Sequence, residues 1–205
     1  DPQLRVGLVG LGGGTGARQL RKLVPNRRLL AFERSKLVLA AFEYFGEPLE
    51  SDFLEVRHAD IFSSRSGPVE PLMLLVVDVA IDGGDGDGQL PEELESEGAW
   101  LSLLEWLHEG GRLVANLGSQ SQGMSQRVSK ALVALRAVSL ATARKVWFAR
   151  YPNSKEGVPP LTNEDLGPDA ACADANLLVL IGAELPLSAW EQVCQGMQQS
   201  LHWTR

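Results

Sequence analysis

The sequence predicts an α/β protein with a three-layer, doubly wound sheet of about seven strands, mostly parallel, with the last strand antiparallel. Two observations predict this fold. Short runs rich in valine and leucine alternate with segments of helical spacing along the whole chain, and such alternation is typical of a mostly parallel sheet covered by helices on both faces. A long loop rich in Pro, Gly and Asp (151–174) joins the last two strands, and a loop connection permits an antiparallel pair.

Each expected element is an apolar run bounded by glycine, proline or polar residues. The strands are expected at 4–11, 27–33, 53–61, 71–80, 109–117, 143–150 and 175–183. The run 71–80 is the most apolar and should form the central, fully buried strand. Helices are expected where leucine and valine recur at helical spacing, at 17–24, 36–45, 93–107, 125–138 and 187–199. Pro25 and Gly46 end the first two helices, and "DGGDGDG" (82–88) is expected to be an acidic loop.

Length, charge and cysteine content exclude several classes of protein. The chain has 205 residues, enough for one domain over 1–205. The net charge of −7 argues against a nucleic-acid binder. Cys172 and Cys194 form no CxxC motif and no Cys/His cluster, so we expect no metal site. No apolar run approaches the roughly 20 residues of a membrane span. We expect a soluble protein of the cytoplasm or, if Asp1 begins a processed chain, of an organelle interior (plastid or mitochondrion).

The glycines at the start of the chain point to a binding turn. "VGLVGLGGGT" (6–15) places Gly10, Gly12, Gly13 and Gly14 between the first strand and the first helix. Glycines there let the backbone turn tightly and let a ligand come close, and the following helix N-terminus favours polar or negative groups. A tight turn without a ligand is the alternative. Thr15 stands where a dinucleotide fingerprint has its third glycine, so no pyrophosphate is demanded.

Three acidic residues follow successive strands. Glu33 lies 21 positions after Gly12, the distance expected for a carboxylate that accepts both hydroxyls of a ribose. Asp60 ends the third strand, where a carboxylate can accept from the amino group of a purine. Asp78 ends the central strand, and ligands of open parallel sheets bind outside those carboxyl ends. For each acid alone, a helix cap or a loop carboxylate is the alternative.

Together, "VGLVGLGGGTGARQLRKLVPNRRLLAFE", "LEVRHADIF", "LVVDVA" and "LHEGGRLVANL" resemble the spermidine synthase-like branch of the class I S-adenosylmethionine methyltransferases. The resemblance runs from about Leu4 to Ala183 and is greater to methyltransferases with a spermidine synthase-like domain than to true polyamine synthases. It implies a seven-stranded sheet with an S-adenosylmethionine site. The implied roles are a nucleoside-binding turn at Gly10, Gly12, Gly13 and Gly14, a ribose acid at Glu33, an adenine contact at Asp60 and an acid beside the reacting centre at Asp78.

The sequence departs from this family at three places. Arg34 and Ser35 follow Glu33, where the family usually has Ile-Asp. Ile81 stands where polyamine synthases have a second acid on the central strand. Those synthases also carry an N-terminal β-domain, whereas this chain begins at the first strand. Polyamine synthesis by this chain is therefore not expected, while methyl transfer, an in-line displacement that depends mainly on orientation, demands less of the site.

Two functions stay open from the sequence. The first is an S-adenosylmethionine-dependent methyltransferase acting on an amine of a protein or small molecule, with aminopropyl transfer as a lesser variant. Its cofactor would be S-adenosylmethionine or a related adenosyl thioether or sulfonium. The second is a non-catalytic methyltransferase-like subunit of a larger protein assembly. An acidic rim at 82–88 could attract a cationic substrate, and Trp203 in the polar tail is a candidate partner contact.

Overall fold

The computed structural model describes residues 5–46, 48–63, 70–82, 88–119, 126–152, 175–182 and 202–204. Contacts between residues divide the chain into two compact units. The first comprises Asp1–Ala80 and Ser102–Val114, and the second comprises Ile81–Leu101 and Ala115–Arg205.

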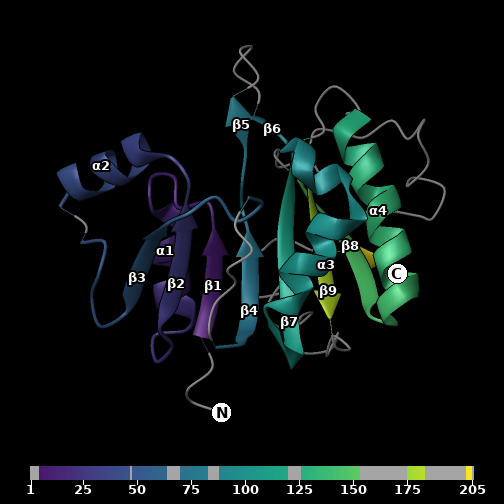
Figure 1. Ribbon diagram of the computed structural model, residues 1–205, viewed down its shortest axis with the longest axis horizontal. Helices are drawn as coiled ribbons and strands as arrows, with labels where there is room; N and C mark the ends of the chain where they lie inside the picture. Colours follow the sequence, from purple (N-terminus) through teal and green to yellow (C-terminus); the bar gives the residue numbers. More distant parts are fainter. Residues whose placement is uncertain are drawn as a thin grey trace. The chain divides into compact units, whose positions relative to one another are not determined.

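The first unit is a parallel α/β sheet (Figure 1). Its strands are β1 (Arg5–Val9), β2 (Leu29–Glu33), β3 (Leu54–His58), β4 (Leu72–Val77) and the first part of β7 (Leu107–Ser119). The hydrogen-bonded order is β7-β4-β1-β2-β3, and β1 pairs in parallel with both β2 and β4, as β2 does with β3. Helix α1 (Thr15–Leu23) connects β1 to β2, and helix α2 (Lys36–Tyr44) connects β2 to β3. All of these elements were predicted.

The core of this unit forms where α1 and α2 pack on β1 and β2. Strand residues Val6, Leu8, Leu29 and Ala31 are at most 1% exposed, because α1 and α2 cover the face of the sheet to which they point. Leu20 of α1 and both Leu39 and Phe42 of α2 belong to the same apolar cluster. This packing places Gly14, at the end of the turn between β1 and α1, against Phe42 of α2.

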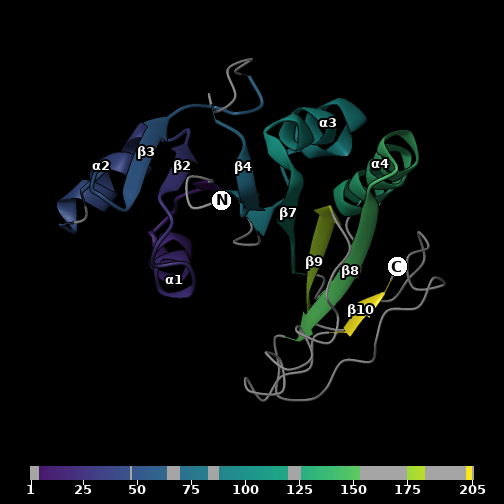
Figure 2. The ribbon, with the colours of Figure 1, turned by 90° about the horizontal axis from the view of Figure 1, so that it is seen from below.

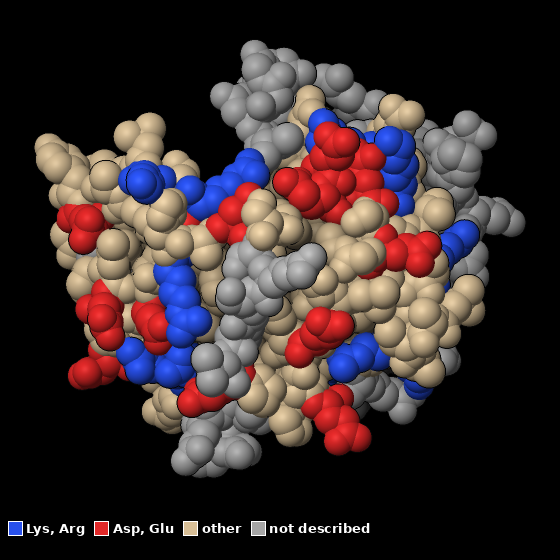
Figure 3. Space-filling model, in the orientation of Figure 1, with Lys and Arg blue, Asp and Glu red and all other residues tan. Residues whose placement is uncertain are grey.

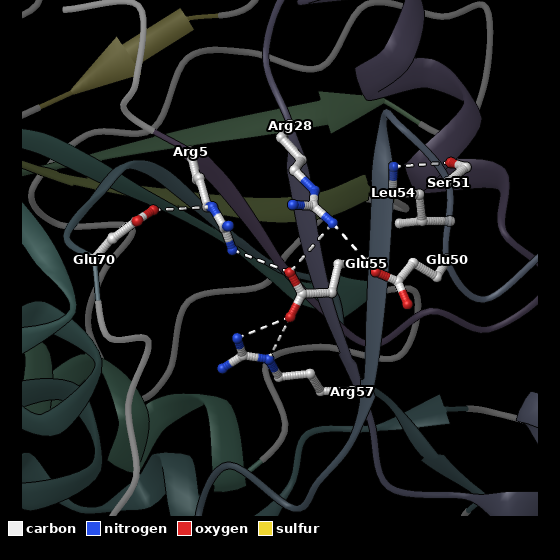
Figure 4. Close-up of polar contacts among 8 residues, drawn as sticks. All are labelled: Arg5, Arg28, Glu50, Ser51, Leu54, Glu55, Arg57 and Glu70. Atoms are coloured by element: carbon white, nitrogen blue, oxygen red, sulfur yellow. Dashed lines mark hydrogen bonds and ion pairs between the residues drawn. The ribbon is translucent and has the colours of Figure 1, made fainter.

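A network of charges joins the amino ends of three strands (Figure 4). The Glu55 carboxylate of β3 accepts a hydrogen bond from Arg5 of β1 at 3.1 Å and lies 3.7 Å from Arg28, just before β2. Arg57 donates to the other Glu55 oxygen at 2.8 Å, and Arg5 also pairs with Glu70 at 3.1 Å. Partial burial alone would raise the pKa of Glu55. The hydrogen bond from Arg57 and the charges of Arg57, Arg5 and Arg28 outweigh it and hold that pKa below its ordinary value.

The second unit contains the antiparallel part of the sheet (Figure 2). Its strands are the last part of β7, β8 (Lys145–Pro152), β9 (Ala175–Gly182) and β10 (His202–Thr204), in the order β10-β8-β9-β7. Strand β8 runs antiparallel to β9 along its whole length and to β10 at its end. Helix α4 (Gln126–Thr142) buries Ala131, Leu135 and Val138. The predicted fold class, a mostly parallel sheet with an antiparallel end and flanking helices, is confirmed.

Several boundaries differ from the prediction for local reasons. The helix expected at 93–107 is a 3-10 helix, η1 (Glu92–Glu95), followed by α3 (Glu97–Glu105). Ser96 separates them because its backbone is extended (φ −105°, ψ 143°) and its Oγ accepts from the Ala99 N–H at 3.3 Å. Strand β7 (Leu107–Ser119) extends beyond the expected range of 109–117 at both ends.

Other differences concern segments expected to be irregular. Two short strands, β5 (Ile81–Asp82) and β6 (Gly88–Gln89), pair antiparallel on either side of the acidic loop. Strand β10 in the C-terminal tail was not predicted, and its Trp203 pairs with Ala149 of β8. Residues 83–87 of the acidic rim, 153–174 of the long loop and the helix expected at 187–199 lie outside the described residues. The single domain over 1–205 stays a prediction. Among the described helices, none combines the length and apolarity needed to cross a membrane.

Candidate functional site

Two glycines of the turn between β1 and α1 are required by packing. Gly10 has φ +89°, and a Cβ built there would lie 2.1 Å from the carbonyl oxygen of Asp78. Gly14 has φ +77°, and its Cβ would lie 2.4 Å from Cε2 of Phe42. A left-handed backbone and contacts this close both exclude a side chain. Gly10 therefore lets β1 approach the end of β4, and Gly14 lets α1 begin directly against α2.

The two central glycines lie at an open surface instead. Gly12 and Gly13 are exposed, and a Cβ built on either would meet no heavy atom within 4 Å. Only Gly12, with φ +50°, has a left-handed backbone. Packing therefore does not explain the glycine at position 13. The space above Gly12 and Gly13 is where the backbone of the turn is accessible to a ligand.

The buried Glu33 carboxylate binds the backbone of this turn. Glu33 is the last residue of β2 and is 8% exposed. Its Oε2 accepts from the backbone N–H of Leu11 at 3.1 Å and of Gly12 at 3.4 Å, and its Oε1 accepts from the N–H of Ser35 at 2.8 Å. A carboxylate has about four acceptor positions, so these bonds use most of its capacity. Two ribose hydroxyls would have to compete with the N–H groups of the turn.

The Arg34-Ser35 departure from the family pattern has a local explanation. Ser35 is the N-cap of α2, and its Oγ accepts from the Val38 N–H at 3.3 Å. The Arg34 carbonyl oxygen lies 3.1 Å from Nε2 of His58. Together with the bond from Ser35 to Glu33, these contacts fasten the start of α2 to the ends of β2 and β3.

Asp60 lies two residues beyond β3, at the neighbouring strand end. The N–H of Ala59 donates to the Glu33 carbonyl at 3.0 Å, which brings this loop beside the end of β2. The Asp60 carboxylate accepts from the Phe62 N–H at 3.0 Å and from the Ser63 hydroxyl at 2.9 Å. Asp60 thus stabilises its own turn, in the loop role that the sequence left as the alternative. Its contact with an adenine stays a prediction.

Asp78 is the first residue after β4 and lies directly beside the glycine turn. Its N–H donates to the Val9 carbonyl at 2.9 Å, and its carbonyl oxygen is the atom that a Cβ on Gly10 would strike. The residue is exposed. Contacts therefore join Asp78, the turn and Glu33 into one group at the carboxyl ends of β1, β2 and β4, the edge at which open α/β sheets bind ligands.

Arg18 is a residue of this region that the sequence analysis did not identify. Its guanidinium donates to the Gly13 carbonyl at 2.9 Å and to the Thr15 hydroxyl at 3.4 Å, so it crosses the first turn of α1. Its position three residues after Thr15, on the same face of α1, is the sequence signal that could have indicated the contact with the Thr15 hydroxyl. On the α1 side of the turn, a groove of about 220 Å³ is lined in part by Arg18, Arg21 and Phe42.

The candidate site consists of carboxylates and backbone amides. Within the described residues, no cluster of three or more His, Cys, Asp or Glu side chains could hold a metal ion. The turn offers N–H donors, Glu33 and Asp60 offer acceptors for hydroxyl or amino groups, and Asp78 offers a carboxylate exposed at the strand end.

Comparisons with known proteins identify the fold. No protein-family model matches the sequence, and no curated protein matches it. A protein from Corynebacterium glutamicum described as a "probable spermidine synthase" is similar in structure, with a TM-score of 0.68 and 16% identity, covering 99% of this chain and 67% of the other. Human methyltransferase-like protein 13, solved in complex with S-adenosylhomocysteine (SAH), has a TM-score of 0.63 and 17% identity, covering 96% and 81%. A chain of a fibrillarin/Nop5p complex has a TM-score of 0.54 and 16% identity, covering 90% of this chain and 74% of the other.

These similarities show that the chain has the fold of the class I methyltransferases and the spermidine synthases, as the sequence resemblance implied. At these identities the likeness concerns the fold. A fold of this kind hosts many functions, and the function depends on the residues of the site.

Proposed function

We propose that this chain binds S-adenosylmethionine, or a related adenosyl thioether or sulfonium, at the turn between β1 and α1, and transfers a methyl group to an amine. The observation that carries the proposal is the open surface at Gly12 and Gly13, directly above the buried carboxylate of Glu33. Glycine at position 13 has no packing reason, so the close approach of a ligand explains it best.

The hydrogen-bond acceptors beside the turn are of the kind that an adenosyl ligand would need. Glu33 would accept a ribose hydroxyl at its remaining acceptor position, and further hydroxyls by exchange with the Leu11 or Gly12 N–H. Asp60, at the next strand end, would accept from the adenine amino group once its bond from Ser63 is released. Both roles need a rearrangement of only local hydrogen bonds, each of which contributes about 1 kcal/mol.

When bound, S-adenosylmethionine supplies an electrophilic methyl group on a sulfonium. The amine forms the new C–N bond as the C–S bond breaks, and the pair of electrons of the C–S bond stays on sulfur as a thioether. The chain must hold the amine in line and remove its proton. Asp78 is exposed at the end of β4 beside the turn, so its carboxylate would position an ammonium or amine and accept that proton directly or through water.

The acceptor would be an amine of a protein or of a small molecule. Transfer of an aminopropyl group is the less favoured variant, because Ile81 occupies the position of the second acid of polyamine synthases. A carboxylate at that position would be needed to hold a second ammonium group of a polyamine.

Calorimetry with S-adenosylmethionine, S-adenosylhomocysteine and methylthioadenosine tests the binding step. We expect binding in the micromolar range by the parent and a loss of at least about tenfold in Gly13→Ala. Gly98→Ala is the matched control, because Gly98 also has open space around its Cβ position but lies in α3. Equal binding by parent and Gly13→Ala, or no binding by the parent, would contradict the proposed site.

Incubation with labelled S-adenosylmethionine and a broad protein extract tests the transfer step. Asp78→Asn keeps the shape of the side chain and removes its charge. We expect it to leave nucleoside binding nearly unchanged and to reduce transfer by about 100-fold, the loss typical of a positioning or acid–base group. Absence of transfer by a parent that binds the cofactor would refute the enzyme proposal for this chain.

A non-catalytic subunit of a larger assembly is the second candidate. The observation that favours it is the Glu33 carboxylate, which already accepts three backbone N–H groups. If that role is purely structural, none of the three adenosyl compounds binds, yet Glu33→Ala still destabilises the chain. Calorimetry of the parent therefore separates the two functions, because the loss of stability in Glu33→Ala is expected under both.

A further inference from the structure

Helix α2 has apolar residues on both of its faces. Leu39 and Phe42 are 8% and 4% exposed and pack in the core. On the opposite face, Leu37 is 80% exposed and Tyr44 is 85% exposed. Phe45, directly after the helix, is 79% exposed. A surface helix normally places polar residues on the face away from the core, so this second apolar stripe requires an explanation.

Along the outward face of α2, large and small side chains follow one another in the same order whichever end of the helix is read first. Ala40 and Ala41, both exposed, lie between Leu37 and Tyr44, and residues three, four and seven positions apart share one face of a helix. The order is therefore large, small, small, large. When two copies of α2 cross antiparallel, Leu37 of each lies opposite Tyr44 of the other. The alanines then face each other and let the backbones approach closely.

From this symmetry we propose that the chain forms a homodimer in which the two α2 helices pack antiparallel through Leu37, Ala40, Ala41, Tyr44 and Phe45, the α2 stripe. The occupant of the stripe is thus a second copy of this chain. This inference concerns a surface apart from the glycine turn and goes beyond the proposed function.

The charges beside the stripe agree with an antiparallel pair. Lys36 and Glu43 are both exposed and lie seven residues apart, on the same flank of the helix. In a two-fold antiparallel pair the same flanks of the two helices meet. Lys36 of each copy then lies near Glu43 of the other, which gives two opposite-charge contacts from one pair of residues. Such contacts add little stability but select the orientation.

The area of the stripe suits the core of a small dimer interface. A Phe or Tyr side chain can bury about 150–250 Å², and these two are about four-fifths exposed. With Leu37 and the alanines, the stripe reaches the few hundred Å² above which exposed apolar patches mark interaction sites. A standard interface buries about 800 Å² per partner, so polar residues around the stripe would supply the rim. Figure 3 shows a largely uncharged surface over α2, at the upper left.

Sedimentation equilibrium of the full chain from about 1 to 100 μM tests the proposal. We expect a monomer–dimer equilibrium in this range. Tyr44→Glu places a charge in the stripe and should weaken the dimer by about 100-fold or more, the loss expected at the centre of an interface. Leu140→Glu is the control, because Leu140 is 87% exposed on α4 and should leave the dimer unchanged. A parent that stays monomeric throughout would overturn the proposal, as would equal effects of the two variants.

Charge exchange tests the antiparallel orientation. Lys36→Glu and Glu43→Lys should each weaken self-association by roughly tenfold, since each places like charges opposite one another. Mixing the two variants should restore association, because the carboxylate introduced in Lys36→Glu then faces the ammonium introduced in Glu43→Lys. The unchanged Glu43 of the first variant meets the unchanged Lys36 of the second. A mixture that associates no better than either variant alone would refute the antiparallel pairing. Binding of a monomeric parent to anionic vesicles, lost in Tyr44→Glu, would also overturn the dimer.

Discussion

Gly10 and Gly13 should respond in opposite ways to the same substitution. In Gly10→Ala the new Cβ meets the Asp78 carbonyl oxygen at 2.1 Å on a backbone with φ +89°. The left-handed backbone alone costs about 1–2 kcal/mol in a residue other than glycine. Because the obstacle is backbone, the ends of β1 and β4 must separate. That movement breaks the bond from the Asp78 N–H to the Val9 carbonyl, worth about 1 kcal/mol.

The expected loss in Gly10→Ala is therefore about 3 kcal/mol of unfolding free energy, a large part of the roughly 5–15 kcal/mol of an ordinary domain. Gly13→Ala meets nothing within 4 Å and needs no left-handed backbone. It should leave stability unchanged, or raise it by about 0.4–1 kcal/mol through the lower entropy of the unfolded chain.

Urea unfolding followed by circular dichroism measures both effects. At a slope of about 2 kcal/mol/M, the midpoint for Gly10→Ala should fall by about 1.5 M, while that for Gly13→Ala should stay level or rise. Equal midpoints for the parent and Gly10→Ala would refute the argument that the approach of Gly10 to Asp78 requires glycine. A large fall in Gly13→Ala would show that position 13 is not open.

Three further substitutions test other contacts. Glu33→Ala leaves the N–H groups of Leu11, Gly12 and Ser35 without their acceptor, so the unfolding free energy should fall by about 2–4 kcal/mol. Glu50→Ala, at a side chain 79% exposed, should change it little, and equal losses would contradict the role of Glu33. Glu55→Gln should cost about 1 kcal/mol at pH 7. Because the folded-state pKa of Glu55 is lowered, its contribution is present above its ordinary value of 4.5 and is lost as the pH falls through the folded-state pKa. The same cost at pH 7 and at pH 2 would exclude the charge network as its cause. Trp100→Phe removes the donor to the Leu94 carbonyl, 2.8 Å away in the buried core, and thermal unfolding should show a loss of about 2 kcal/mol.

The order of strands and helices was readable from the sequence because it depends on local pattern. Apolar runs such as 71–80 mark strands buried on both faces, and glycine or proline marks where helices end. The antiparallel end of the sheet was also predicted, because the sequence between the last two expected strands is rich in Pro, Gly and Asp and has no helical pattern. The break at Ser96 and the pairing of Trp203 in β10 were not predicted, because one depends on a single serine cap and the other on a partner about fifty residues away in the sequence.

The sequence by itself determined which residues could form a site. Glycines at 10–14 and acids after successive strands must gather at one edge of a parallel sheet, since the carboxyl ends of its strands all lie there. Only the tertiary structure decided what each residue does there. Gly10 and Gly14 are required because a side chain there would strike Asp78 and Phe42, while Gly12 and Gly13 face open space. Spacing along the chain cannot distinguish the packed glycines from the open ones. The structure also decided that Glu33 bonds to the turn itself, because a hydrogen bond depends on the positions of atoms that the sequence places 21 and 22 residues apart.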